Sequence, residues 1–434
     1  MSPADKKTRY TKSNALLERA LKVIPLGSQT FSKSYTQFPA GLSPLFLTQG
    51  QGGRVWDVDG HEYVDMVSAL LPVVLGYQDK DVDRAIQEQL KKGISFSLAT
   101  ELEVELAERL VEIIPCAEMV RYGKNGSDAT SATVRLARAV TGRDRIAAGG
   151  YHGWHDWYVG ATVRNRGIPE AVGRLTHKFP YNDIRALHQL FKDHPGEFAA
   201  VIMEPMNVSE PYPGYLQEVR DLAHEHGALL IFDEIITGFR YALGGAQEYF
   251  GVVPDLAAFG KSMGNGMPIS AVLGKAEYMR VMEEVFVSFT FGGEALSLAA
   301  SIAVIDKMRR KPVIETLWKT GKTLADGIGK LLRENGLEKE IVLGGLPPWT
   351  ILNFNAHGST DKDVIKTFFI RSMLEQGILM HTNHNVCYAH TEKDIRKVLD
   401  AYEKVLPLIR EGLSEGDLEK QLACPVIRPV FSVR

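Results

Sequence analysis

The sequence predicts an α/β protein with a large, mostly parallel sheet domain and a smaller C-terminal α+β domain. Two observations carry this prediction. Between about residues 80 and 300, short apolar runs alternate with segments of helical periodicity, which is typical of a parallel sheet covered by helices. After about residue 303, long helical segments surround a short set of strands. With 434 residues, 45% of them hydrophobic, the chain can build more than one core.

Three segments follow from these patterns. Residues 1–75 form an N-terminal segment with a helix at 13–24 and a hairpin at 53–63, which turns at Asp59 and Gly60. Residues 76–302 form the large α/β domain, with helices at 101–114, 128–141 and 216–226 and strands at 145–148, 199–203, 228–232 and 256–259. Residues 303–434 form the small domain, with helices at 303–310, 313–335, 360–377 and 391–411 around strands within 341–354.

Net charge, the length of the apolar runs and cysteine content indicate which partners and which compartment to expect. The 50 Lys and Arg nearly balance the 53 Asp and Glu, giving a net charge of −3, which excludes the strongly basic surface of a nucleic-acid-binding protein. The apolar runs are shorter than the roughly 18 residues of a membrane helix, and no signal-peptide core follows the N-terminus. Three scattered cysteines fit a reducing compartment. We expect a cytoplasmic protein that acts on small molecules.

Polar residues follow three neighbouring predicted strands. Glu204 follows the strand at 199–203, Asp233 follows the one at 228–232, and Lys261 comes just after the one at 256–259. The carboxyl ends of parallel strands meet at one edge of a sheet, where α/β proteins bind their ligands. Two acids and a lysine are therefore expected at one edge.

Lys261 precedes a flexible, glycine-rich segment at 262–268. A phosphate-binding P-loop is excluded, because its first glycine would fall at Asp255. The setting suits a lysine that reaches a ligand as a nucleophile or Schiff-base former. The alternative is a surface lysine that merely ends a strand.

Asp233 follows five apolar residues, so its carboxylate is expected to be buried. Burial of a carboxylate costs several kcal/mol unless a cation or strong donors meet it. A protonated pyridine nitrogen would be such a cation. An ion pair with Arg240 is the alternative, and it suits Glu234 better than Asp233.

Two further segments could bind parts of a planar, phosphorylated ligand. Gly126 and Ser127 precede a helix, where backbone donors and a hydroxyl can bind phosphate, although a plain N-cap has the same pattern. Tyr151 begins a run rich in flat side chains, which can stack on a ring or pack in the core. The histidine pairs lack a third ligand at suitable spacing, so no metal site is expected.

Taken in this order, these segments resemble the class III aminotransferases that use pyridoxal phosphate, and most closely the glutamate-1-semialdehyde aminomutases. The resemblance runs from about residue 20 to residue 400, and it is most specific at 55–60, at 233–240, and at Gly260 and Lys261 with the loop that follows. It implies a fold of the type I aminotransferase class, pyridoxal 5'-phosphate as cofactor, and a homodimer with shared active sites.

The resemblance also implies roles for single residues. Lys261 would hold the cofactor as a Schiff base and move a proton, and Asp233 would pair with the pyridine nitrogen. The other residues implied to contact the cofactor are Gly126, Ser127, Tyr151, Glu204, Asn207 and Ile235, with Thr290 reaching the phosphate of the neighbouring subunit.

Substrate residues depart from the aminomutase pattern. Lys33 stands where those enzymes have a carboxylate-binding arginine, Leu70 replaces an aromatic wall, and the histidine-rich loop at 379–388 has no recognisable acidic gate. Together with His384, Lys33 would suit an anionic or sugar-derived acceptor. The leading hypothesis is a transaminase that moves an amino group from an amino acid donor to a carbonyl acceptor. The alternatives are an intramolecular aminomutase and a binding protein that keeps the fold without catalysis.

Overall fold

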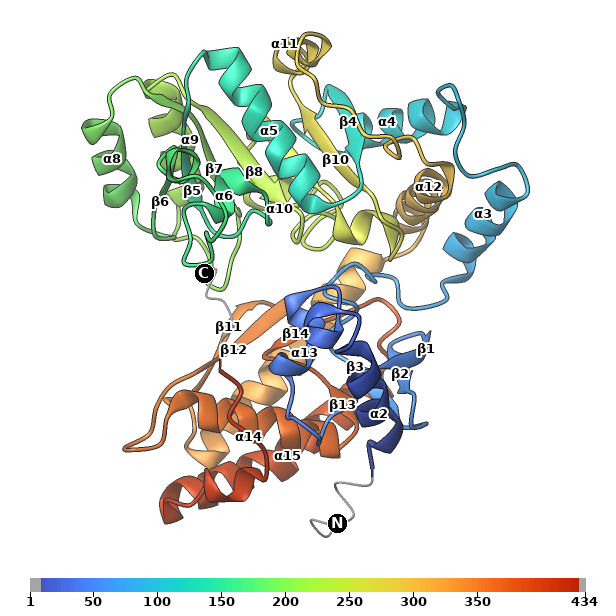
Figure 1. The fold of residues 1–434 in the computed structure, drawn as a ribbon, viewed down its shortest axis with the longest axis vertical. Coiled ribbons are helices and arrows are strands. Elements are labelled where there is room, and N and C mark those ends of the chain that lie inside the picture. Colours follow the sequence, from blue (N-terminus) through green and yellow to red (C-terminus); the bar gives the residue numbers. More distant parts are fainter. Residues whose placement is uncertain (1–8, 429–434) are drawn as a thin grey trace. The chain divides into compact units, whose positions relative to one another are not determined.

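The structure is a computed structural model that describes residues 9–428. Its described residues fall into two compact units, shown in Figure 1. One contains residues 9–70, 75–78 and 315–428, and the other contains residues 71–74 and 79–314. We call them the terminal unit and the central unit. The residue bounds of the three segments drawn from the sequence stay predictions.

A seven-stranded sheet forms the middle of the central unit. Its order is β4-β10-β9-β8-β7-β5-β6. The strands β5 to β9 pair in parallel, and β10 runs antiparallel to both β4 and β9. The predicted large, mostly parallel sheet is therefore confirmed. Its strands are β4 (Met119–Gly123), β5 (Arg145–Gly149), β6 (Thr176–Lys178), β7 (Phe198–Met203), β8 (Leu229–Glu234), β9 (Leu256–Phe259) and β10 (Ser270–Gly274).

Helices cover both faces of this sheet, because its central strands are apolar on both sides. Ile231 of β8 belongs to a core that includes α5 (Gly126–Thr141), whereas Leu230 and Phe232 pack in a second core with α8 (Ile184–Asp193) and α9 (Tyr215–Glu225). The remaining helices of the unit are α3 (Lys80–Leu90), α4 (Glu101–Ile113), α6 (Asp156–Val159), α7 (Glu170–Gly173), α10 (Ala246–Phe250), α11 (Ala276–Met279) and α12 (Ala295–Arg310).

Two helices begin earlier than the sequence predicts, for reasons that lie in their caps. Helix α5 begins at Gly126 because Asn125 and Asp128 form a reciprocal capping box. Helix α12 begins at Ala295, well before the predicted start at residue 303, because the Glu294 carboxylate accepts from the backbone N–H groups of Leu296 and Ser297. Glutamate is not among the usual N-caps, so this start carries a weak signal. Helix α12 also runs through residues 302 and 303, where a domain bound was expected.

The terminal unit has two small sheets. The predicted hairpin is present as β2 (Arg54–Asp57) and β3 (Glu62–Asp65), and the Asp57 carboxylate accepts from the N–H groups of Asp59 and His61 within its turn. Strand β3 also pairs in parallel with β13 (Ile378–Leu379), so early and late parts of the chain share one sheet. The other strands are β1 (Leu47–Gln51), β11 (Ile341–Leu346), β12 (Trp349–Phe354) and β14 (Asn383–Asn385).

The helices of the terminal unit are α2 (Thr11–Ala20), α14 (Lys362–Glu375) and α15 (Glu392–Glu415). The long helix α13 (Val313–Asn335) starts in the central unit and continues into the terminal one. Within residues 9–428, none of the helices combines the length and the apolar character needed to cross a membrane.

Candidate active site

Asp233 lies near the end of β8 with only 4% of its surface exposed. One carboxylate oxygen, Oδ2, is 2.8 Å from the Nδ1 atom of the buried His152, and the other accepts from the N–H of Ile235 at 3.1 Å. Since a carboxylate accepts, Nδ1 of His152 donates, and its Nε2 atom is buried with no hydrogen-bond partner among the described residues. The Asp233 carboxylate is therefore buried, as the sequence predicts, and it accepts hydrogen bonds from two donors.

Lys261 starts the short 3-10 helix η4 (Lys261–Gly264), directly after β9 and Gly260. Strand β9 pairs in parallel with β8, with Asp233 opposite Ala258 and Glu234 opposite Phe259. The lysine and the buried acid therefore follow adjacent strands at the same edge of the sheet. Lys261 is partly exposed, and its φ of 39° places it in the left-handed region that side-chain-bearing residues rarely occupy.

The N-terminus of α5 lies against the loop that carries Tyr151 and His152. The Ser127 hydroxyl accepts from the N–H of Trp154 at 3.2 Å, and the Thr130 hydroxyl donates to the His152 carbonyl at 2.8 Å. Gly153 has a φ of 98°, and a side chain there would overlap the Ser127 hydroxyl. This close approach requires glycine.

The side chain of Ile235 packs against two of the predicted site segments, at Gly126 and at Gly260. A Cβ atom at Gly126 would lie 3.0 Å from its Cγ2 atom, and one at Gly260 would lie 3.1 Å from its Cδ1 atom. The isoleucine side chain therefore lies between the start of α5 and the glycine that precedes Lys261. A larger residue at either glycine would crowd the Ile235 side chain.

Glu204, Tyr151 and Asn207 form a second small network. Glu204 follows β7 and is 4% exposed, and its Oε2 atom accepts from the N–H of Tyr151 at 3.1 Å and from the Asn207 side chain at 2.8 Å. The Tyr151 ring contacts Tyr158 edge to face, with 5.7 Å between ring centroids. Glu204 therefore fixes the backbone of the loop from which Tyr151 projects.

Glu234, the acid next to Asp233, is held by hydrogen bonds from neighbouring protein groups. Its carboxylate accepts from the Thr237 hydroxyl and from the N–H groups of Ala246 and Gln247 at 2.7 and 2.8 Å. Burial raises its pKa, although these hydrogen bonds oppose the rise. Arg240 is fully buried and donates through Nη2 to the Leu71 carbonyl at 3.0 Å.

Thr290 lies in the loop between η5 (Arg280–Glu283) and α12, and it is exposed. The neighbouring aromatic residues Phe286 and Phe291 are 84% and 58% exposed. Val287 and Phe289 of the same loop pack in or against the core, so the loop is seated on the central unit with Thr290 exposed.

The predicted substrate residues Lys33 and Leu70 both belong to the terminal unit. Lys33 is exposed in the 3-10 helix η2 (Phe31–Lys33). Leu70 is the third of four successive residues with positive φ, from Ser68 at 45° to Leu71 at 83°. Left-handed backbone costs about 1 kcal/mol per such residue. Two backbone N–H groups, of Val67 and Ser68, donate to the Asp65 carboxylate at the start of this turn.

The expectation that His384 contacts substrate is wrong. His384 lies on β14 and is fully buried, with Nδ1 2.9 Å from the Thr350 hydroxyl and Nε2 2.7 Å from the Tyr402 hydroxyl. Both ring nitrogens have protein partners, so neither is available to a ligand. Desolvation by burial lowers its pKa to about 3, which keeps the ring neutral.

This burial predicts an acid-sensitive terminal unit. In the unfolded chain His384 binds a proton near its ordinary pKa of 6.5, whereas in the folded chain it resists protonation down to about 3. Its stabilising contribution is therefore present above pH 6.5 and is lost as the pH falls below that value, by up to about 1.4 kcal/mol per pH unit. Urea midpoints of His384→Asn, measured from pH 7.5 to 4.5, should vary less steeply with pH than those of the wild type. His188→Asn controls for removal of an exposed histidine, and equal slopes for His384→Asn and the wild type would contradict the assignment.

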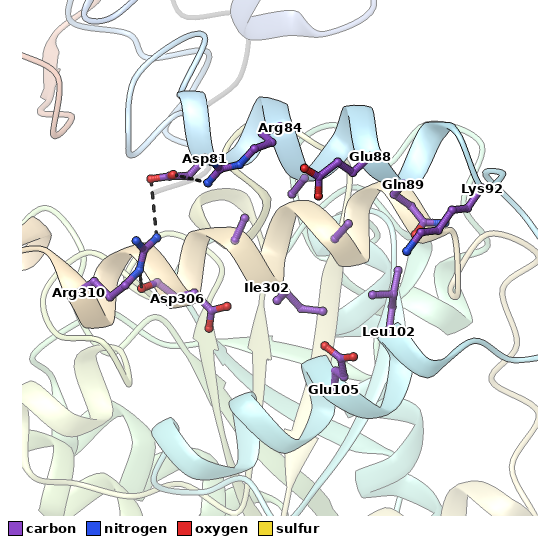
Figure 2. Close-up of a pocket in the computed structure, with 13 residues that line it drawn as sticks. Asp81, Arg84, Glu88, Gln89, Lys92, Leu102, Glu105, Ile302, Asp306 and Arg310 are labelled. Carbon is purple, nitrogen blue, oxygen red and sulfur yellow. Dashed lines mark hydrogen bonds and ion pairs between the residues drawn. The ribbon is translucent and has the colours of Figure 1, made fainter.

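A groove of about 320 Å³ lies on the central unit, away from the residues above. Figure 2 shows that α3, α4 and α12 line it. Three of its charged side chains form ion pairs, since Asp81 contacts both Arg84 at 3.1 Å and Arg310 at 3.8 Å. It contains none of the predicted site residues.

Among residues 9–428, no group of three or more potential metal-ligating side chains occurs. His152 belongs to the predicted run of flat side chains and to one of the histidine pairs weighed as metal ligands, but its contact with Asp233 was not predicted. The available signal was its position directly after Tyr151, following the strand next to β7. Which side chain of that loop turns toward β8 depends on the backbone path, which the sequence does not reveal.

Comparisons with known proteins agree with this geometry. A family model described as Aminotransferase class-III matches residues 37–406. The 3-aminobutyryl-CoA aminotransferase of Cloacimonas acidaminovorans is 37% identical over 94% of this chain and 98% of that protein. The glutamate-1-semialdehyde 2,1-aminomutase of Desulforamulus reducens is 36% identical over 90% of this chain and 96% of that protein.

Solved structures are similar over the same length. The FumI protein of Sphingopyxis sp. MTA144, solved with PLP, superposes with a TM-score of 0.86 and 31% identity, covering 93% of this chain and 98% of that one. An omega-transaminase from Sphaerobacter thermophilus superposes with a TM-score of 0.83 and 28% identity, covering 92% and 99%. The fold is thus the type I fold of these transaminases. The chain belongs to the class III aminotransferases and is a pyridoxal-phosphate-dependent enzyme of that family.

Proposed function

We propose that the protein is a transaminase that moves an amino group from an amino acid donor to a carbonyl acceptor. One observation carries the proposal. A buried carboxylate, Asp233, and a partly exposed lysine, Lys261, follow adjacent parallel strands at one sheet edge. An enzyme that uses pyridoxal phosphate needs an acid for the ring nitrogen and a lysine for the aldehyde.

The residues present fit the cofactor. Asp233 offers a carboxylate where a protonated ring nitrogen needs one, and it is already oriented by His152. Gly126 and Ser127 at the start of a 16-residue helix offer backbone and hydroxyl donors to a phosphate. Gly126 and Gly260 allow the side chain of Ile235, the residue proposed to contact the ring, to pack closely against both backbone segments.

Each protein group then has a defined task. When bound, pyridoxal phosphate supplies an electron sink that stabilises a carbanion at the substrate carbon. Asp233 keeps the ring nitrogen protonated, and His152 holds the carboxylate in place through Oδ2. Lys261 would hold the cofactor through its aldehyde, and its amine would carry the proton to and from the substrate carbon. Tyr151 and Ile235 orient the ring, with Glu204 and Asn207 supporting the Tyr151 loop.

The proposal includes a homodimer with shared active sites. Thr290 lies in an exposed loop between two exposed phenylalanines, so it is placed to meet another molecule. Exposed aromatic side chains of this kind are typical of interface anchors. In the dimer, the Thr290 hydroxyl would donate a hydrogen bond to the phosphate bound in the partner's site. A cytoplasmic location completes the proposal, because all three cysteines are free thiols.

Thr290→Val should weaken cofactor retention. The substitution keeps the shape of the side chain and removes the hydroxyl, and loss of a hydrogen bond to a charged group corresponds to about a tenfold loss in affinity. The loss should depend on protein concentration, because the hydroxyl arrives from a partner subunit. Cofactor release after dilution, followed by absorbance at several protein concentrations, measures this. A monomer that retains the cofactor fully would refute the shared site.

Substrate selection is assigned to Lys33 and Leu70. Lys33 supplies a single positive charge, which suits an anionic or sugar-derived acceptor. Leu70 would form an apolar wall.

A second candidate is an intramolecular aminomutase, favoured by the 36% identity to a glutamate-1-semialdehyde aminomutase. The two are separated by supplying glutamate-1-semialdehyde with no external acceptor, and separately by supplying amino donors with a panel of anionic keto compounds. The transaminase prediction is turnover of a donor and acceptor pair with little isomerisation. Efficient isomerisation and no transfer to any external acceptor would establish the aminomutase.

A further inference from the structure

Loop 286–294, which carries Thr290, is unusually well anchored for an exposed segment. At its start, the carbonyls of Phe286 and Val287 accept from Arg135 and Arg121, each at 2.8 Å. At its end, the Glu294 carboxylate contacts the Lys124 ammonium at 3.0 Å. All three cations come from the segment formed by β4, its connection and α5.

The pair of Lys124 and Glu294 is the best shielded of these anchors. The two side chains are only 16% and 11% exposed. Glu294 also caps α12, accepting from the N–H of Leu296 at 2.7 Å and from the Ser297 hydroxyl at 2.6 Å. Burial tends to raise the pKa of Glu294, but the Ser297 and Lys124 hydrogen bonds outweigh it and lower the pKa. The carboxylate is thus held from several directions.

The connection also reaches the proposed phosphate site. Lys124 comes two residues before Gly126, and its backbone N–H donates to the Asp128 carboxylate at 3.1 Å. The same carboxylate accepts from the N–H of Asn125 at 2.7 Å, which fixes the backbone that leads into α5. One ion pair therefore joins the start of α5 to the loop that bears Thr290.

We propose that Lys124 and Glu294, aided by Arg121 and Arg135, are positioning residues that hold loop 286–294 in the conformation presenting Thr290 to the partner subunit's phosphate. The inference rests on the proposed function, because it assigns these residues to cofactor retention. An exposed loop would otherwise be ordered only on dimerisation, at an entropic cost to binding. The ion pair orders the loop within each chain before dimerisation, so this entropic cost does not weaken binding.

The chain offers a closely matched control. Lys307 is 14% exposed and pairs with Asp79, which caps α3 through the N–H groups of Asp81 and Val82. Lys307→Met therefore removes a similarly buried lysine from a helix-capping carboxylate in the same unit. Lys124→Met, Glu294→Gln and Lys307→Met would be compared with the wild type in full-length protein.

Two ligands separate the positioning role from a general loss of stability. Pyridoxal phosphate should bind about tenfold more weakly to Lys124→Met and Glu294→Gln. Pyridoxal, which lacks the phosphate, should bind these variants as it binds the wild type. Lys307→Met should retain the affinity for both ligands. In the cofactor-free protein, hydrogen exchange of the peptide spanning 286–294 should be faster in Lys124→Met than in Lys307→Met.

A double-mutant cycle tests whether the pair acts through Thr290. In a Thr290→Val background, Lys124→Met should add little further loss of pyridoxal phosphate affinity. Equal loss in both backgrounds, equal loss for both ligands, or unchanged exchange of the loop would overturn the inference while leaving the transaminase proposal intact. A wild-type protein that binds no pyridoxal phosphate would instead overturn the proposed function.

Discussion

Lys261→Ala should abolish covalent attachment of pyridoxal phosphate and lower kcat by about 10³-fold or more. The amine both binds the aldehyde and moves the proton, and loss of general acid–base catalysis alone costs about 10² to 10⁴-fold. Noncovalent binding should survive in part, because Asp233 and the start of α5 are unchanged. Reduction of the wild-type enzyme with borohydride, followed by peptide mapping, should place the label on Lys261.

Lys275 is the matched control for this experiment. It also follows a buried strand, β10, but its ammonium contacts the Asp255 carboxylate at 2.9 Å. That ion pair raises its pKa, so its amine is a poor nucleophile. Lys275→Ala should keep the colour and activity of the wild type. A label on Lys275, or on any lysine other than Lys261, would overturn the site assignment.

Asp233→Asn should reduce turnover far more than cofactor binding. Asparagine keeps the shape of the side chain but removes the negative charge that holds the ring proton, so the carbanion loses its electron sink. Loss of one such electrostatic contribution lowers kcat on the order of 10² to 10³-fold. Steady-state kinetics and cofactor affinity, measured on the same preparations, give the comparison. Equal losses in both would count against the electron-sink role.

Asp255→Asn provides the control for burial. Asp255 is 1% exposed and directly precedes β9, so it lies at the opposite end of that strand from Lys261. Its carboxylate is hydrogen-bonded to the side chains of Lys275 and His224. Removing its charge should lower stability and leave kcat nearly unchanged. His152→Asn adds a second test, because a residue that only positions Asp233 should lower kcat less than Asp233→Asn does.

The placement of Asp233 and Lys261 could be predicted from sequence because it follows from local pattern. Each comes after an apolar strand, and parallel strands bring their carboxyl ends to one edge. The contact of His152 with Asp233 could not be predicted in this way. It depends on the path of the loop after β5, which is set by the close packing of Gly153 on Ser127.

The error at His384 has a different cause. The histidine-rich loop at 379–388 suggested a substrate contact, but His384 lies on β14, where Thr350 and Tyr402 satisfy both of its ring nitrogens. Both partners are distant in sequence, so the pattern gave no sign that the ring was already satisfied. Long-range polar pairing of this kind is where sequence reasoning fails most readily.

The central claim is that the enzyme transfers an amino group in two separable half-reactions. The most direct measurement adds one amino donor, such as glutamate, to the purified holoenzyme with no acceptor present. We expect the visible absorbance of the bound cofactor to disappear while one equivalent of keto acid is released per active site. After the donor is removed, a different carbonyl compound should restore the absorbance. If common amino donors leave the spectrum unchanged while glutamate-1-semialdehyde is converted without any external acceptor, the transaminase account is contradicted.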